Sequence, residues 1–302
     1  MPRHDTTELM EAIWRDAKVP VGSTYRDPAI ILGMATDQME RMVVPELLKV
    51  PGNHLMTFEE QPLLPDTLRY RFPTRAIRPE RLQVHDESGK MLGKLVLAAP
   101  DMVDDVLAGR CPRGNAYGYW CPENSHAVVV LQNRWQGISD TRRLRCYYRR
   151  EVARLCLPAE CRIVTDVIGS IVTLTTFNSD DVTEDDLSFG PWDVIHPSSP
   201  FEPVVDDVFA DGTTTSSMEI YSMPTSIKRG DVFCPAGYAC FPQIPKAYIG
   251  AVVAYTAARV LAADPEAKGR ARADAMDVIT TAQATITPRA DEAETVVNND
   301  WL

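Results

Sequence analysis

The sequence predicts an α+β fold in which a helical bundle, built from the N- and C-terminal helices, carries a long antiparallel β-rich insertion and an extended C-terminal tail. Helical periodicity marks both ends of the chain, whereas short apolar or alternating runs broken by prolines and glycines fill the middle. The last segment is acidic and lacks periodicity. We therefore expect a discontinuous bundle from 1–60 and 245–286, a β-rich domain from 61–244 and a tail from 287–302.

The predicted helices begin at capping residues. Asp5-Thr6-Thr7-Glu8 has the form of a capping box, in which an N-cap oxygen and a glutamate three positions on satisfy free backbone N–H groups. Asp27-Pro28 and Asp264-Pro265 each place an N-cap carboxylate before a proline at the first helical position. Apolar residues then recur at helical spacing, and Pro45 should interrupt the second helix because it lacks an N–H donor.

The middle of the chain predicts strands and hairpins. Leu68–Phe72 alternates apolar residues with arginines, which indicates a strand with one apolar face. The apolar runs 82–85 and 91–97 flank a turn-like Glu-Ser-Gly-Lys, and the runs 163–167 and 171–175 flank Ile-Gly-Ser. We expect a hairpin at each of these places.

Charge is unevenly distributed along the chain. The net charge of −11 argues against a general nucleic-acid binder, because neutralising phosphates requires a basic surface. Residues 178–219 hold eleven acidic side chains and no Lys or Arg, whereas residues 142–162 hold seven arginines against two glutamates. Opposed blocks of this kind suit steering between subunits of a ring, and Arg149 and Arg150 are our candidate subunit contacts. The alternative is a solvated surface with an incidental asymmetry.

The cysteines and histidines do not predict a metal site. The seven cysteines are odd in number and include no CxxC pair, so we expect free thiols made in a reducing cytosol. We interpret the cysteines at 111, 121, 146, 156 and 161 as lacking the spacing of structural zinc sites, and the five histidines as scattered. The start of the chain does not resemble a signal peptide, and no apolar run is long enough to span a membrane.

We also expect no catalytic residues and no cofactor. The sequence has neither a GxxxxGK[ST] phosphate loop nor a strand-linked GxGxxG. The acidic segment 178–186 is either a solvated loop or a calcium-binding one, and we favour the solvated loop. A hydrolase with a site in residues 111–135 is an alternative, in which the aromatic residues would line a sugar site rather than fill a core or subunit contact. Those residues are Tyr117, Tyr119, Trp120 and Trp135.

Several short phrases occur in an order that resembles a known family. The first is the helical start through Tyr25-Arg26-Asp27-Pro28, followed by a Met-rich helix. The second is the run from Tyr70 to Ile77 before the first hairpin. The third is Lys228-Arg229-Gly230-Asp231-Val232, followed by Pro242-Gln243-Ile244-Pro245 before the last helices. With the C-terminal tail, this order resembles the head–tail adaptor (connector) proteins of tailed double-stranded DNA phages, most like those of short-tailed phages.

The resemblance implies a structural virion protein without enzymatic activity. In that family the helical bundle docks beneath the portal ring, the β-rich insertion lies on the tail side or outside, and the C-terminal tail reaches up along the portal. Twelve copies surround the DNA channel, through which DNA passes without specific binding. The expected partners are the portal protein, tail nozzle or tail-fibre proteins and further copies of the chain. A nozzle or a fibre anchor is the nearest alternative.

The C-terminal tail is the candidate portal contact. Residues 288–302 could extend roughly 50 Å at ~3.3 Å per residue. Val296, Val297, Trp301 and Leu302 are apolar anchors in an otherwise acidic segment. Such a segment can fold on binding, with a buried tryptophan contributing much of the affinity.

Overall fold

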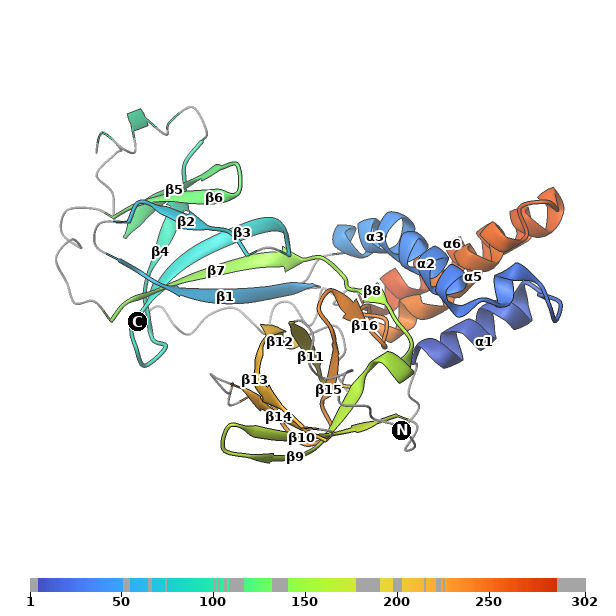
Figure 1. Cartoon of the computed structure of the whole chain (residues 1–302). Helices are drawn as coiled ribbons and strands as arrows, with labels where there is room; N and C mark the ends of the chain where they lie inside the picture. The colour runs from blue at the N-terminus through green and yellow to red at the C-terminus, as the bar shows by residue number, and fades with distance from the viewer. Residues whose placement is uncertain are drawn as a thin grey trace. The chain divides into compact units, whose positions relative to one another are not determined.

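The computed structural model describes residues 5–286, except for 51–54, 65–66, 74, 100–101, 103, 106–107, 109–116, 132–140, 178–190, 198–202, 215, 221–223 and 225. The chain forms two compact units (Figure 1). We call Leu55–Glu151 the β unit, and Met1–His54 with Val152–Leu302 the mixed unit. This division differs from the expected one, because the middle of the chain is split at Glu151 and its second half joins the helices.

The fold class predicted from the sequence is wrong, because the structure is not built on a helical bundle. About 35% of the structure is helical and 37% is strand, so sheet rather than a helical bundle dominates, and the term α+β fits only loosely. Most strands belong to two curled, half-barrel sheets of seven strands each. The insertion is also not purely antiparallel, because two strand pairs are parallel. Sequence periodicity identified the short runs as strands but could not show that they join into sheets this large.

The β unit is built on one seven-stranded sheet. Its order is β1-β7-β3-β4-β5-β6-β2, in which only the β4–β5 pair is parallel. The strands are β1 Met56–Pro62, β2 Arg69–Arg71, β3 Ala76–His85, β4 Met91–Leu97, β5 Gly118–Glu123, β6 His126–Leu131 and β7 Arg143–Arg150.

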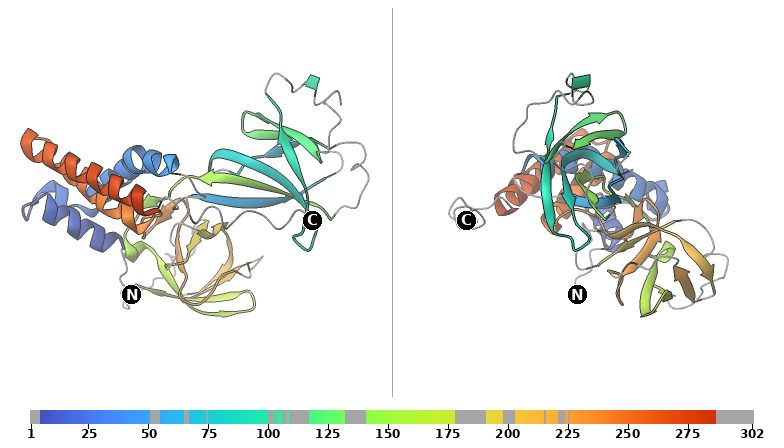
Figure 2. Two further views of the ribbon diagram at one scale, coloured as in Figure 1. Left: turned by 180° about the vertical axis from the view of Figure 1, so that it is seen from behind. Right: turned by 90° about the vertical axis from the view of Figure 1, so that its left-hand side faces the viewer.

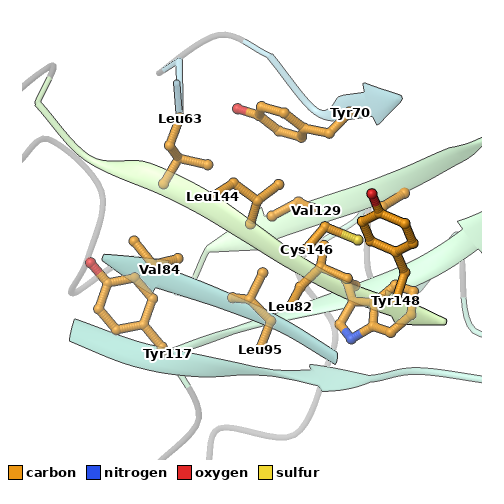
Figure 3. Close-up of a cluster of buried hydrophobic side chains, with 12 residues drawn as sticks. Leu63, Tyr70, Leu82, Val84, Leu95, Tyr117, Val129, Leu144, Cys146 and Tyr148 are labelled. Atoms are coloured by element: carbon orange, nitrogen blue, oxygen red, sulfur yellow. The ribbon is translucent and has the colours of Figure 1, made fainter. Parts of the chain in front are cut away.

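A core fills the concave side of this sheet. Leu82, Leu144 and Trp120 are almost fully buried within it. Figure 3 shows Leu82, Leu144 and Cys146 among side chains that converge from several strands and from Leu63. The core joins residues far apart in the sequence, so the unit has its own hydrophobic stabilisation.

The mixed unit contains the second sheet. Its order is β12-β11-β15-β9-β10-β14-β13, and every recorded pair is antiparallel. The strands are β9 Arg162–Ile168, β10 Ile171–Thr176, β11 Trp192–Ile195, β12 Pro203–Val208, β13 Ala210–Thr213, β14 Ser217–Ile220 and β15 Val232–Pro235. A separate parallel pair joins β8 Arg154–Leu155 to β16 Tyr238–Ala239.

Helices from both chain ends pack together in the mixed unit. Helix α5 contacts α1, α2 and α6, and the left view of Figure 2 shows helices from both ends of the chain side by side. The helices are α1 Thr6–Asp16, α2 Pro28–Gln38, α3 Val44–Lys49, α5 Ile249–Val260 and α6 Pro265–Ile286. Within the part of the chain that the structure describes, none of the helices has the length and apolar character of a membrane span.

The capping predictions are confirmed at the start of three helices, including α6, where the Asp264 carboxylate accepts the backbone N–H groups of Glu266 and Ala267 at 3.1 and 3.0 Å. The Asp5 carboxylate accepts the Glu8 backbone N–H at 3.0 Å, and the Asp27 carboxylate accepts that of Ala29 at 2.9 Å. The interruption at Pro45 is a π-helical turn, Met39–Val43, which precedes α3. A proline removes one helical N–H and its ring crowds the carbonyl four residues earlier, so a wider turn relieves both conflicts.

Candidate functional site

The candidate subunit contacts, Arg149 and Arg150, have intrachain roles. Both lie at the end of β7, between its neighbours β1 and β3. The Arg149 guanidinium donates to the Glu80 carboxylate at 2.9 Å, and the side chain of Arg150 is buried, with 3% exposed. Both side chains are thus used within the β unit, so we do not propose either arginine as a subunit contact.

Other arginines of the basic block are also engaged within the chain. Arg145 forms an ion pair with Glu60, which stands directly opposite it on β1. Arg142 is buried and donates to the Tyr117 hydroxyl at 2.9 Å. Strands β1 and β3 therefore supply carboxylates from distant parts of the chain to two arginines of the block.

The aromatic residues of the alternative hydrolase site lie mostly in a core. Tyr117 and Trp120 belong to the core of the β unit, with 4% and 2% exposed. Trp135 lies outside the described residues, as do the acidic segment 178–186 and Cys111. The candidate portal contacts, Val296, Val297, Trp301 and Leu302, also lie outside them.

The segment Lys228–Val232 forms a tight turn. Asp231 donates its N–H to the Lys228 carbonyl at 3.1 Å, and Gly230 has a φ of +92°, which favours glycine. The buried Asp231 carboxylate accepts the Lys228 N–H at 2.7 Å and contacts His196 Nδ1 at 2.5 Å. Asp231 thereby fixes the turn and orients a histidine whose side chain is 43% exposed.

Four cysteine sulfurs meet inside the mixed unit, and we call them the sulfur cluster. They come from two loops that are far apart in the sequence. Cys156 and Cys161 bracket the short 3₁₀ turn Pro158–Glu160, whereas Cys234 lies on β15 and Cys240 follows β16. Cys156 is 3% exposed, and the other three are fully buried.

The sulfurs of the cluster lie in direct contact. The Sγ–Sγ distances are 3.3 Å for Cys161–Cys234, 3.5 Å for Cys156–Cys161 and 3.9 Å for Cys234–Cys240. Three of the four, from Cys156, Cys161 and Cys234, all lie within 4.8 Å of one another. This donor set is chemically able to hold a soft metal ion.

The two loops of the cluster are held together by the backbone. The Cys156 N–H donates to the Ala239 carbonyl at 3.1 Å, and the Arg154 N–H donates to the Gly237 carbonyl at 2.9 Å. Thr6, the first residue of α1, joins both loops: its hydroxyl donates to the Cys156 carbonyl at 2.7 Å and its N–H to the Cys240 carbonyl at 2.9 Å. The parallel β8–β16 pair therefore holds the Cys156 and Cys240 segments side by side, and the antiparallel β9–β15 pair, with Phe233 opposite Arg162, brings Cys234 beside Cys161.

The thiols of the cluster titrate abnormally. Burial, which disfavours the charged thiolate, is the main cause that raises the pKa of Cys240 well above its usual value. Contacts with the thiols of Cys156, Cys161 and Cys240 instead lower the pKa of Cys234. Negative charge in the cluster is thus stabilised at Cys234, on the sulfur that the other thiols surround.

The sequence did not predict that these four cysteines lie together. Four residues separate Cys156 from Cys161, which lies within the spacing of structural zinc ligands, and five separate Cys234 from Cys240. The interpretation that the first pair lacks zinc-ligand spacing is therefore wrong. The available signal was therefore two loosely spaced cysteine pairs, although only the fold shows that they converge.

A groove of about 470 Å³ lies beside the cluster. Residues of α2 form one wall, and the segment from Arg154 to Leu157 forms another, with Cys156 among the lining residues. Asp37 at the groove pairs with Arg259 at 2.8 Å, and the hydrogen bond from this arginine lowers the pKa of the Asp37 carboxyl. The groove gives an approach to the Cys156 side of an otherwise buried cluster.

Comparison with known proteins does not assign the chain to a family. Neither protein-family models nor curated protein sequences gave a match.

Proposed function

We propose that the protein is a structural virion component, a head–tail adaptor whose copies form a ring between the portal and the tail. The observation that carries this proposal is the packing of α5 against both α1 and α2. It joins the two ends of the chain in one unit, in the order of segments that resembles the adaptor family, with residues 287–302 following α6.

Exposed apolar side chains on β4 also favour the interpretation that the protein is part of a larger assembly. Leu92 and Val96 are 39% and 46% exposed, and alternation along the strand places them on the face of β4 opposite Leu95, which belongs to the core. Large apolar side chains that gather on a surface are typical of contacts between proteins. In the proposed ring, a second copy of the chain covers them.

The proposed setting is the neck of a virion assembled in a bacterial host. The partners are the portal protein on one side and nozzle or fibre proteins on the other, and DNA passes through the ring without specific binding. The net charge of −11 is compatible with this setting, because a like-charged surface does not retain DNA electrostatically.

Electron microscopy of the chain alone and mixed with the portal protein from the same genome tests this function. We expect a ring that forms from the chain alone or caps the portal. The images also give the number of subunits in the ring. A monomer that ignores the portal would contradict the proposal. A variant that ends at residue 287 should keep its melting temperature but bind the portal more weakly.

Two matched substitutions distinguish the effect of the apolar anchors on portal binding from the effect of tail length. Trp301→Ala removes a large apolar anchor, whereas Asn299→Ala changes a neighbouring polar residue. We expect only the first to weaken portal binding by tenfold or more, because a buried tryptophan contributes about 2 kcal/mol or more to an interface. Equal binding by both variants would contradict the role of the tail.

A further inference from the structure

The spacing of the sulfur cluster fits one tetrahedral metal ion. Four thiolates at ~2.3 Å from a zinc ion lie ~3.8 Å from one another. Three Sγ–Sγ distances in the cluster, 3.3, 3.5 and 3.9 Å, lie around that value, and the sulfurs of Cys156, Cys161 and Cys234 all lie within 4.8 Å of one another. Two of these distances, Cys156–Cys161 and Cys234–Cys240, lie within one segment of the chain. The third, Cys161–Cys234, joins the two segments.

The surroundings fit a structural site rather than a catalytic one. The sulfurs lie in an apolar cluster with Ile195, Val232 and Phe241, and structural zinc sites are closed in this way. Oxygen-preferring ions such as Mg²⁺ and Ca²⁺ do not suit four sulfurs. An iron–sulfur cluster would keep several atoms between the cysteines, so their sulfurs would stand farther apart than they do here.

Two of the strands next to the cysteines are short. β8 and β16 have two residues each, and the turn between Cys156 and Cys161 has three. Such short elements have few backbone hydrogen bonds to hold them. A metal bound by both loops would fix them together and fix α1 with them, because Thr6 bonds to both loops.

A buried cation stands beside the cluster. Arg162 follows Cys161 directly and is 4% exposed, and its guanidinium donates to the carbonyls of Ala159 and Cys161 at 3.0 Å each. Four thiolates around one divalent ion carry a net charge of about −2. A guanidinium at this place would offset part of that charge inside the protein.

We infer that Cys156, Cys161, Cys234 and Cys240 bind a single structural zinc ion through their four sulfurs. Binding converts four S–H groups to thiolates and releases their protons to solvent, with no change in oxidation state. The inference rests on the geometry of the cluster and is independent of the adaptor function. It replaces the expectation from the sequence that the protein has no metal site and only free thiols.

The first test is the metal content of the full chain. The protein is purified under reducing conditions on a resin without immobilised metal, and its zinc is measured by mass spectrometry of the elements. We expect about one zinc per chain. Exchange with cobalt should then give the visible absorption bands of a tetrahedral thiolate site, which report the geometry directly.

Matched variants locate the site. Cys161→Ser and Cys234→Ser should each lose most of the zinc, whereas Cys121→Ser and Cys146→Ser should keep it. The last two cysteines are just as buried but lie in the β unit. If the first two variants do not fold, the cobalt spectrum of the unaltered protein still decides the question.

Three results would overturn the inference. The first is a folded, reduced protein that contains no zinc and takes up neither zinc nor cobalt. The second is a thiol count under denaturing, non-reducing conditions that shows these cysteines joined in disulfides. The third is iron in place of zinc as the resident metal. None of these experiments involves the portal protein, so their failure and the failure of the proposed function are distinguishable.

Discussion

Thr6 shows how much one buried hydroxyl can join. Its side chain is fully buried and bonds to the Cys156 carbonyl, whereas its neighbour Thr7 is exposed. Thr6→Val keeps the shape but removes the donor, and we expect it to lower the free energy of unfolding by about 1–3 kcal/mol. Thr7→Val is the matched control and should change it by less than about 0.5 kcal/mol. Urea unfolding followed by circular dichroism measures both, and equal effects would contradict the role of the bond.

Cys146 is a buried thiol outside the sulfur cluster. Burial is the main cause that raises its pKa to about 12. The pKa of a cysteine in an unfolded chain is ~8.5, so at pH 8 only the unfolded form holds an appreciable share of thiolate. We expect iodoacetamide to label Cys146 at pH 8 only as fast as the β unit opens, because the thiolate is the reactive form. Peptide mass spectrometry measures the rate, and labelling as fast as in urea would contradict this prediction.

At the scale of elements, two glycines should respond to alanine in opposite directions. A Cβ on Gly118 of β5 would lie 2.5 Å from the Val130 carbonyl oxygen, which is backbone and cannot move aside. We expect Gly118→Ala to destabilise the β unit by about 1–3 kcal/mol. Gly269 lies in α6 with nothing within 4 Å of the added atom, so Gly269→Ala should stabilise the protein by about 0.5–1 kcal/mol. Thermal melting of both variants tests the signs.

Local signals in the sequence predicted the individual elements well. The helix starts after Asp5 and Asp27 follow from side chains that bond to nearby backbone, and such bonds depend on a few consecutive residues. The two hairpins, β3–β4 and β9–β10, follow in the same way from turn residues between apolar runs. These predictions succeeded because the interactions behind them are local.

Long-range pairing was beyond the sequence. The β1–β7 pair joins Met56 to Arg149, and no local pattern shows that Glu60 will stand opposite Arg145. For this reason the arginine block appeared free for subunit contacts, and the cysteines appeared unrelated. The sulfur cluster depends on the β8–β16 pair, in which Arg154 is opposite Tyr238. Both features depend on long-range pairing, which no run of consecutive residues reveals.

At the scale of the whole molecule, the β unit is one continuous segment of the chain, whereas the mixed unit is built from two segments. The β unit begins and ends on neighbouring strands, because the Arg150 N–H donates to the Leu55 carbonyl at 2.9 Å. Its ends are therefore adjacent, and the chain enters and leaves it at nearly one place. An arrangement of this kind is typical of a domain inserted into another.

We therefore expect residues 55–151 to fold when they are expressed alone. The fragment contains all seven strands of the first sheet and its complete core, and its ends meet without the mixed unit. A cooperative thermal transition and dispersed amide signals in nuclear magnetic resonance spectra would support independent folding. A fragment that stops at residue 131 is the control: it lacks β7, which lies between β1 and β3, so it should stay unfolded. If the longer fragment is also unfolded, the β unit depends on the rest of the chain and is not a separate domain.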